Sequence, residues 1–284
     1  MNNILTFDVE EWFHLLDFDA TRTEDKWGKY EVRIHENMER IFRILEETDT
    51  KATFFVIGWI AKTYPEVVRK IAEKYEVGSH TMTHQLVWQQ KPEEFKQDVE
   101  ASIKLLQDIT GKPVKYFRAP GYSIRESESY AFETLAELGI EIDSSVFPAK
   151  HAHGGMPSFP IATPSIIEHN GIRIKELPIT LGKVLGKDLI YSGGGYFRLL
   201  PYSLIKKLTK KNSAYNMTYL HPRDLDSEQP VLDGLSRIRR FKAYVGTKGA
   251  EAKLRKYLTD FKFNDISTAN EQIDWENVQV IKLK

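Results

Sequence analysis

Short apolar runs and amphipathic segments alternate through the N-terminal half of the chain. Residues 4–10 alternate apolar and polar side chains with a period of two, which predicts a strand with one buried face. Apolar residues at helical spacing predict helices between the strands. The predicted strands are residues 4–10, 51–57, 77–79, 116–118 and 141–143, and the predicted helices are residues 35–46, 65–75, 92–109 and 127–138. This order is typical of a parallel sheet, so we expect an α/β fold closed or nearly closed into a barrel.

The alternation stops between about residues 148 and 200, where glycine, proline and histidine are dense. We interpret this segment as an insertion that carries a few strands, residues 172–177 being the clearest, and a flexible glycine stretch near residue 194. The pattern then resumes, with a helix over residues 202–211, a strand over 216–220 and helices near 235–244 and 250–261. We expect residues 1–284 to form a single domain that ends in an irregular tail from about residue 266 to 284.

Composition narrows the classes of function. The 284 residues include 40 Lys and Arg against 40 Asp and Glu, so the chain has no excess positive charge that would favour nucleic-acid binding. There is no cysteine, which excludes thiol nucleophiles and leaves His, Asp and Glu as metal ligands. The sequence shows no secretory leader and no apolar run long enough to span a membrane, so we expect a cytoplasmic protein.

Two histidines and two nearby acids predict a metal site. His80 and His84 are four residues apart, so on a helical turn both side chains would lie on one face and could bind one cation. Asp8 and Glu10, on one face of the first strand, are the candidates for a third ligand, and strand alternation favours Glu10 over Glu11. A carboxylate on the metal and a second one beside it would suit amide hydrolysis. The alternatives are surface histidines without a metal and acids that only solvate a loop.

Further candidates also lie at the ends of predicted strands. His221 is a candidate general acid if Asp143 raises its pKa, and a packing residue otherwise. Arg118 is a fixed cation that either holds Asp8 ionised or forms a purely structural salt bridge. Two aromatic side chains are candidates for stacking on a sugar ring, with core packing as the alternative: Trp12 and Tyr196.

Taken in order, these motifs resemble those of the polysaccharide deacetylase family, carbohydrate esterase family 4, whose members share the chitooligosaccharide-deacetylase homology domain. The similar segments, within about residues 3–225, are 6–10, 79–84, 118–122, 143–145 and 220–222. The resemblance implies a distorted (β/α) barrel of about seven strands. It also implies one divalent metal ion, zinc with cobalt, nickel or manganese as alternatives, and an N-acetylated sugar or oligosaccharide as the substrate.

The resemblance assigns a role to each candidate residue. The implied roles are general base for Asp8, general acid for His221, metal ligand for His80 and His84, tether of Asp8 for Arg118, tuning of His221 for Asp143, and part of the substrate cleft for Tyr122. The first motif of the family commonly has two adjacent aspartates, and Val9 stands where the second would be. We therefore assign the acidic ligand to Glu10, on the acid-x-acid spacing that some members of the wider family use.

Segments 10–14, 143–148, 192–201 and 221–230 resemble one bacterial subgroup that is associated with exopolysaccharide or cell-surface glycan gene clusters. This implies a sugar precursor or a growing glycan, in the cytoplasm or close to a membrane. Two other functions fit the same residues. One is a metal-independent, allantoinase-like amidohydrolase of a small cyclic substrate, whose activity would survive chelation. The other is a non-catalytic glycan-binding barrel, which would release no acetate.

Overall fold

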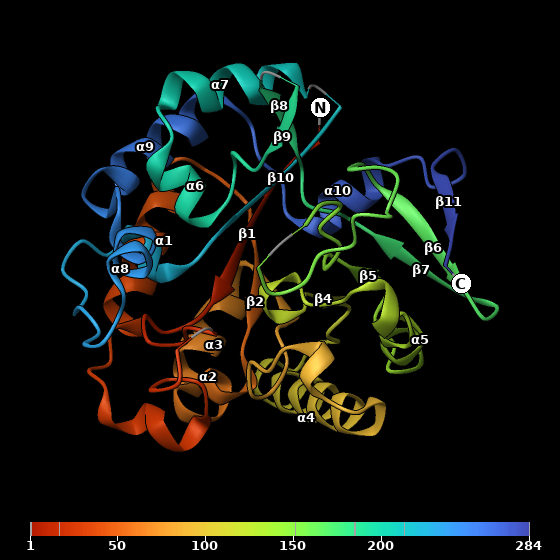
Figure 1. Ribbon diagram of the computed structural model, residues 1–284, viewed down its shortest axis with the longest axis horizontal. Coiled ribbons are helices and arrows are strands. Elements are labelled where there is room, and N and C mark those ends of the chain that lie inside the picture. The colour runs from red at the N-terminus through yellow and green to blue at the C-terminus, as the bar shows by residue number, and fades with distance from the viewer. Residues whose placement is uncertain (1, 17, 151, 185, 213, 284) are drawn as a thin grey trace.

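The computed structural model describes residues 2–16, 18–150, 152–184, 186–212 and 214–283 (Figure 1). Its strands are β1 (Asn2–Val9), β2 (Thr53–Val56), β3 (Glu76–Ser79), β4 (Tyr116–Phe117), β5 (Ile142–Asp143), β6 (Ser165–His169), β7 (Ile172–Glu176), β8 (Gly182–Val184), β9 (Lys187–Leu189), β10 (Tyr215–Leu220) and β11 (Gln279–Lys282). Its α-helices are α1 (Ile34–Glu47), α2 (Gly58–Thr63), α3 (Pro65–Lys74), α4 (Pro92–Thr110), α5 (Tyr130–Glu137), α6 (Gly194–Leu199), α7 (Tyr202–Lys211), α8 (Arg237–Tyr244), α9 (Thr247–Asp260) and α10 (Ile266–Gln272).

One sheet organises the molecule. Its strand order is β10-β1-β2-β3-β4-β5-β7-β6-β11, and every neighbouring pair is parallel except β6 and β7. Helices flank this mostly parallel sheet, which confirms the predicted α/β class. Because β10, β1, β2, β3, β4 and β5 all run in the same direction, their carboxyl ends lie along one edge of the sheet.

The sheet of the described residues is not closed, so of the two forms that we expected, closed or nearly closed, the structure has the open, barrel-like one. β10 and β11 form its two edges, and Figure 1 shows β6, β7 and β11 at one side of the molecule, away from β10. The reason is the hairpin of β6 and β7: after β7 pairs with β5, the antiparallel β6 and then β11 extend the sheet outward. The chain therefore adds strands beyond β5 instead of returning to β10.

The central strands are buried on both faces, as parallel strands between packed layers are. In β1, Leu5 and Phe7 belong to the main hydrophobic cluster, whereas Ile4 belongs to a second cluster on the other face. Phe7 stacks on Phe54 of β2 with ring centroids 5.1 Å apart. The main cluster also includes Ile281 of β11, so it joins the first and last strands. The expectation of a single domain stays a prediction.

The predicted helices are confirmed in the N-terminal half, and three segments differ from expectation. The helix α2 was not predicted, because it has only six residues. The glycine stretch leads into a helix, α6, rather than a loop. The tail is not irregular: Asp265 accepts a hydrogen bond from the N–H of Thr268 at the start of α10, and β11 pairs with β6. Within the described ranges, every helix is too short or too polar to span a bilayer.

Candidate functional site

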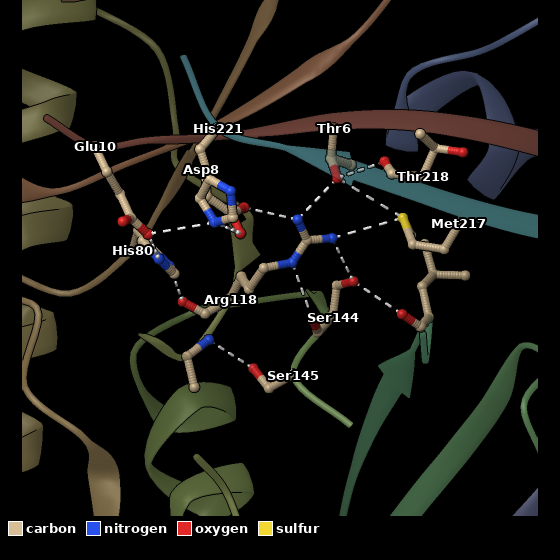
Figure 2. Close-up of polar contacts among 12 residues, drawn as sticks. Thr6, Asp8, Glu10, His80, Arg118, Ser144, Ser145, Met217, Thr218 and His221 are labelled. Atoms are coloured by element: carbon tan, nitrogen blue, oxygen red, sulfur yellow. Dashed lines mark hydrogen bonds and ion pairs between the residues drawn. The ribbon is translucent and has the colours of Figure 1, made fainter. Parts of the chain in front are cut away.

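Side chains from four strand ends converge at the carboxyl edge of the sheet (Figure 2). The residues concerned are Asp8 in β1, Glu10 after β1, His80 after β3, Arg118 after β4 and His221 after β10. These strands are parallel, and most of them are neighbours, so residues that are far apart in the chain end at the same place. The convergence predicted from the motifs is therefore present in the structure.

Glu10, His80 and His84 form a buried cluster of metal-ligand type. The Glu10 Oε1 atom lies 3.0 Å from Nε2 of His84 and 3.3 Å from Nε2 of His80. One ligand atom from each of the three residues lies within 4.8 Å of the others. Burial alone would raise the pKa of Glu10, but the neighbouring His84 and His221 and the hydrogen bonds from the imidazoles lower it well below its usual range.

The orientation of His80 fits a cation in this cluster. Its Nδ1 lies 2.7 Å from the backbone oxygen of Arg118, which can only accept a hydrogen bond. In a neutral imidazole the proton is then on Nδ1, and the lone pair of Nε2 points at the Glu10 carboxylate. Two acceptors that face each other at 3.3 Å need a cation or a proton between them. A histidine held through its other nitrogen by a backbone carbonyl is the usual arrangement of a metal ligand.

The segment that joins the two histidines is a loop and not the helical turn that their spacing suggested. Thr81 and His84 have positive φ values of 65° and 57°, which a helix does not contain. Asp98 of α4 holds this loop by accepting hydrogen bonds from the N–H groups of residues 82 and 83, at 2.7 and 3.2 Å. Sequence reasoning missed Asp98, because an acid in an amphipathic helix resembles a solvent-exposed residue.

Arg118 contacts Asp8 as the tether interpretation requires. The guanidinium Nη1 lies 2.7 Å from Oδ1 of Asp8, and the same nitrogen donates to the Thr6 hydroxyl at 2.8 Å. Nη2 donates to the Ser144 hydroxyl at 2.9 Å, so the side chain is fixed from several directions (Figure 2). Arg118 is completely buried. The second carboxylate oxygen of Asp8 faces His221, 3.9 Å from its Nε2.

His221 is paired with Asp224, a residue that sequence reasoning missed. Nδ1 of His221 lies 2.9 Å from Oδ2 of Asp224, and the other oxygen of this carboxylate lies 2.7 Å from Nε of Arg198 in α6. Burial alone would lower the pKa of His221, but Glu10, Asp224 and Asp8 raise it to about 9. Burial would raise the pKa of Asp224, yet Arg198 and His221 lower it well below its usual range. The signal for Asp224 was its position three residues after the histidine.

The expected contact between Asp143 and His221 is replaced by a different pairing. Asp143 accepts a hydrogen bond of 2.5 Å from the Ser145 hydroxyl and shares another with Glu176, its neighbour across β5 and β7. Burial raises the pKa of Asp143, and burial together with Asp143 raises that of Glu176 well above its usual range. Asp143 therefore belongs to a buried acid pair. The position beside His221, which was predicted for Asp143, is occupied by Asp224.

The acidic neighbour Glu11 has a separate task from Glu10. Its Oε1 accepts hydrogen bonds of 2.8 Å from the N–H groups of Arg33 and Ile34, at the start of α1. These are N–H groups that a helix start leaves without partners in its own backbone. Burial raises the pKa of Glu11 to about 7, although the same hydrogen bonds act in the opposite direction. Glu11 therefore caps a helix, and the preference for Glu10 as the acidic ligand is consistent with the geometry.

The three aromatic candidates lie in different surroundings. Trp12 is buried against Phe13, and its indole N–H donates to the backbone oxygen of Glu31 at 2.9 Å, so the structure places it in the core and not in a sugar contact. Tyr122 is also buried, with a φ of 53° and its ring 5.1 Å from that of Tyr219. Tyr196, in α6, is 44% exposed. Among the three, only Tyr196 is on the surface.

A pocket adjoins the metal-ligand cluster at His84. It lies between the segment after β1 and the segment after His84, with Leu86, Gln89 and Thr21 among its walls. His14 also lines it. The backbone N–H of residue 11 donates to Nδ1 of His14 at 3.3 Å, so the proton of a neutral ring is on Nε2. In the described part of the chain this Nε2 has no hydrogen-bond partner.

Comparison with known families and proteins gives two matches along the chain. Residues 6–142 match the family described as Polysaccharide deacetylase, and residues 144–271 match DUF3473, a domain of unknown function. A peptidoglycan-N-acetylglucosamine deacetylase of Bacillus cereus is 35% identical over 98 residues, which are 34% of this chain and 33% of that protein. A chitooligosaccharide deacetylase of Azorhizobium caulinodans is 35% identical over 82 residues, which are 28% of this chain and 39% of that protein.

Structural comparison covers the whole chain. A crystal structure described as a putative polysaccharide deacetylase from Mycobacterium smegmatis aligns with a TM-score of 0.68 and 17% identity, over 100% of this chain and 93% of that one. At this identity the likeness concerns the fold. The sequence matches to the two curated deacetylases span about a third of each protein. Residues 6–142, just under half of the chain, therefore form a domain of the polysaccharide deacetylase type, carbohydrate esterase family 4.

Proposed function

We propose that the chain is a metal-dependent hydrolase that removes the acetyl group from an N-acetylated saccharide, a glycan or a glycan precursor, and releases acetate. The observation that carries the proposal is the convergence of Glu10, His80 and His84 beside the Asp8 and His221 pair. The similarity to deacetylases of peptidoglycan and of chitooligosaccharides supports an N-acetylated sugar as the substrate class.

The cluster would hold one divalent ion through the carboxylate of Glu10 and the Nε2 atoms of His80 and His84. Two imidazoles and one carboxylate accept zinc, and also cobalt, nickel or manganese. When bound, such an ion would act as a Lewis acid, which would make the amide carbonyl carbon more electrophilic and water easier to deprotonate. Three protein ligands leave positions open for substrate and water, as in catalytic metal sites.

Asp8 is suited to the role of general base. Its carboxylate is held by Arg118 through one oxygen, and the other faces the site. As water adds to the amide carbon, Asp8 would take the proton that the water oxygen loses. The salt bridge with the fully buried Arg118 fixes the position of the Asp8 carboxylate beside the metal-ligand cluster.

His221 is suited to the role of general acid. Its pKa, raised to about 9, keeps the imidazole protonated at neutral pH. When the bond between the carbonyl carbon and the nitrogen breaks, His221 would give its Nε2 proton to the nitrogen. The products are then acetate and a free amine on the sugar. Asp224 would act as a positioning residue, because it fixes the imidazole through Nδ1 and leaves Nε2 toward Asp8.

The test measures metal content and acetate release from the same purified protein. We expect about one zinc or related ion per chain by elemental analysis, and acetate release from at least one member of a panel of chitooligosaccharides, peptidoglycan fragments and N-acetylated monosaccharides. Chelation should abolish the release, and added zinc should restore it. Asp8→Asn should lower turnover by about 10²- to 10⁴-fold, whereas the matched variant Asp108→Asn, at an exposed position of α4, should not.

Two results would contradict the proposal. Amide hydrolysis that survives complete chelation would favour a metal-independent amidohydrolase. Saturable sugar binding without acetate release from any substrate of the panel would favour a glycan-binding barrel.

A further inference from the structure

Exposed apolar side chains gather on two short helices of the C-terminal half. Of seven large hydrophobic residues that are exposed in the described part of the chain, four lie in α6 and α8. They are Tyr196 and Leu199 in α6, 44% and 48% exposed, and Ile238 and Phe241 in α8, 70% and 56% exposed. The two helices contact each other. Because each of these side chains is at least 44% exposed, the helices present apolar surface to the surroundings.

The helix α8 is basic as well as apolar. Its sequence, RIRRFKAY, contains four Lys or Arg residues and no acid, on a chain whose formal net charge is zero. At 3.6 residues per turn, Ile238 and Phe241 lie on one face, and Arg237 and Lys242 lie on either side of them. No residue of α8 is buried. Within the described ranges, no acidic side chain forms a salt bridge with Arg237, Arg240 or Lys242.

The same helix is tied to the candidate active site. Arg198 of α6 donates to the backbone oxygens of Lys242 and Val245, at 3.1 and 2.7 Å, and binds Asp224 through Nε. Asp224 in turn holds His221. These contacts use carbonyls at the C-terminal end of α8, which a helix leaves free for such donors. The apolar and basic surface is therefore connected, through Arg198 and Asp224, to the candidate general acid His221.

We propose that α8, together with α6, docks the protein onto a membrane of anionic lipids. A short helix with lysines and arginines beside exposed Ile and Phe has the composition of an interfacial helix, which inserts its apolar face among headgroups and places its cations against lipid phosphates. The cations of α8 favour an anionic partner, because this helix is positive although the chain as a whole has no net charge. Docking on this face would bring the candidate site close to glycans at a membrane surface, but the docking does not depend on the proposed hydrolysis.

Vesicle flotation tests the proposal directly. The full chain should float with vesicles of phosphatidylcholine mixed with phosphatidylglycerol, and not with phosphatidylcholine alone. Binding should weaken strongly at about 1 M salt, where the Debye length is about 3 Å. Phe241→Ser should weaken the partitioning by about tenfold. Arg237→Gln and Lys242→Gln should each weaken it by about fivefold.

Matched variants make the test specific to this surface. Lys207→Gln with Lys210→Gln removes two exposed cations of α7, and Val280→Ser removes an exposed apolar side chain of β11. Both controls should bind vesicles like the unaltered chain. Equal binding to neutral and anionic vesicles, or an equal loss in the controls, would overturn the proposal. So would sedimentation showing a dimer that Phe241→Ser dissociates, because the face would then join two copies of the chain.

Discussion

The two halves of the chain contribute different chemistry to one site. The half that matches the polysaccharide deacetylase family carries the metal-ligand cluster of Glu10, His80 and His84, together with Asp8. The half that matches the domain of unknown function carries His221. The first half holds its groups at strand ends, His80 through a backbone carbonyl and Asp8 through the buried Arg118. The second half holds the imidazole of His221 through the carboxylate of Asp224, which in turn binds Arg198. The comparison teaches that the candidate cation site and the candidate general acid have separate supports, so that substitutions should separate them.

The largest effect is expected from the first half. His80→Ala removes one nitrogen ligand, so the purified protein should lose its metal ion, and acetate release should fall by several orders of magnitude. Elemental analysis and an acetate assay on the same sample measure both effects. The control is His35→Ala, since His35 is exposed and contacts only Glu66 among acidic side chains of the described residues. A variant that keeps its full metal content would remove His80 from the cluster.

The second effect should separate the halves. His221→Ala removes the candidate proton donor but none of the three metal ligands. We expect turnover to fall by about 10²- to 10⁴-fold, with the metal content of the unaltered chain. The measurements are again acetate release and elemental analysis. If turnover stayed near normal, His221 would have no part in the reaction; if the metal were lost as well, the two supports would not be separate.

The third prediction concerns the support of His221. A negative charge beside an imidazole stabilises its protonated form, so Asp224→Asn should lower the pKa of His221 from its raised value. The alkaline limb of the kcat/KM profile should therefore move to lower pH, with turnover reduced by about 10- to 100-fold. Asp143→Asn is the informative control, because Asp143 contacts Ser145 and Glu176 instead. A shift of the limb in Asp143→Asn and none in Asp224→Asn would reverse the assignment.

The sequence predicted the fold well where the pattern is local. Alternation in residues 4–10 and helical spacing in residues 92–109 correspond to β1 and α4, since each element buries a face that its own residues define. Closure of the sheet was not predictable in this way. It depends on whether β6 and β11 pair outward or return to β10, and the strand patterns are the same in both cases. The prediction of an irregular tail was wrong for the same reason, because β11 has only four residues and its partner strand lies more than a hundred residues earlier.

The site was predictable as far as strand ends determine it. Parallel strands bring their carboxyl ends together, so a histidine or an acid just after a strand has a defined place in space. Side-chain pairing is different, because it depends on register and rotamer. The register of β5 and β7 places Asp143 opposite Glu176. The carboxylate that contacts His221 is that of Asp224. The assignment of Asp143 followed strand order, which does not contain that information.

The smallest effect distinguishes two adjacent carboxylates of the first half. Glu11→Ala removes the acceptor for two N–H groups at the start of α1, so it should lower the free energy of unfolding by about 1–3 kcal/mol and leave the metal content unchanged. Glu10→Ala should show the opposite pattern: the metal should be lost, and the free energy of unfolding should change less than in Glu11→Ala. Chemical denaturation and elemental analysis of both variants measure the contrast. Equal loss of metal in both variants would show that Glu11 also supports the cluster.

The pH dependence of stability sharpens this contrast. Burial raises the pKa of Glu11 from 4.5 to about 7, so the folded chain holds this proton more tightly than the unfolded chain does. The resulting contribution to stability is complete below pH 4.5 and is lost as the pH rises through 7. Glu11→Gln keeps an acceptor for the helix N–H groups but cannot titrate. Its free energy of unfolding should therefore fall less between pH 4.5 and 7 than that of the unaltered chain, and an equal slope in both would contradict the buried, protonatable Glu11.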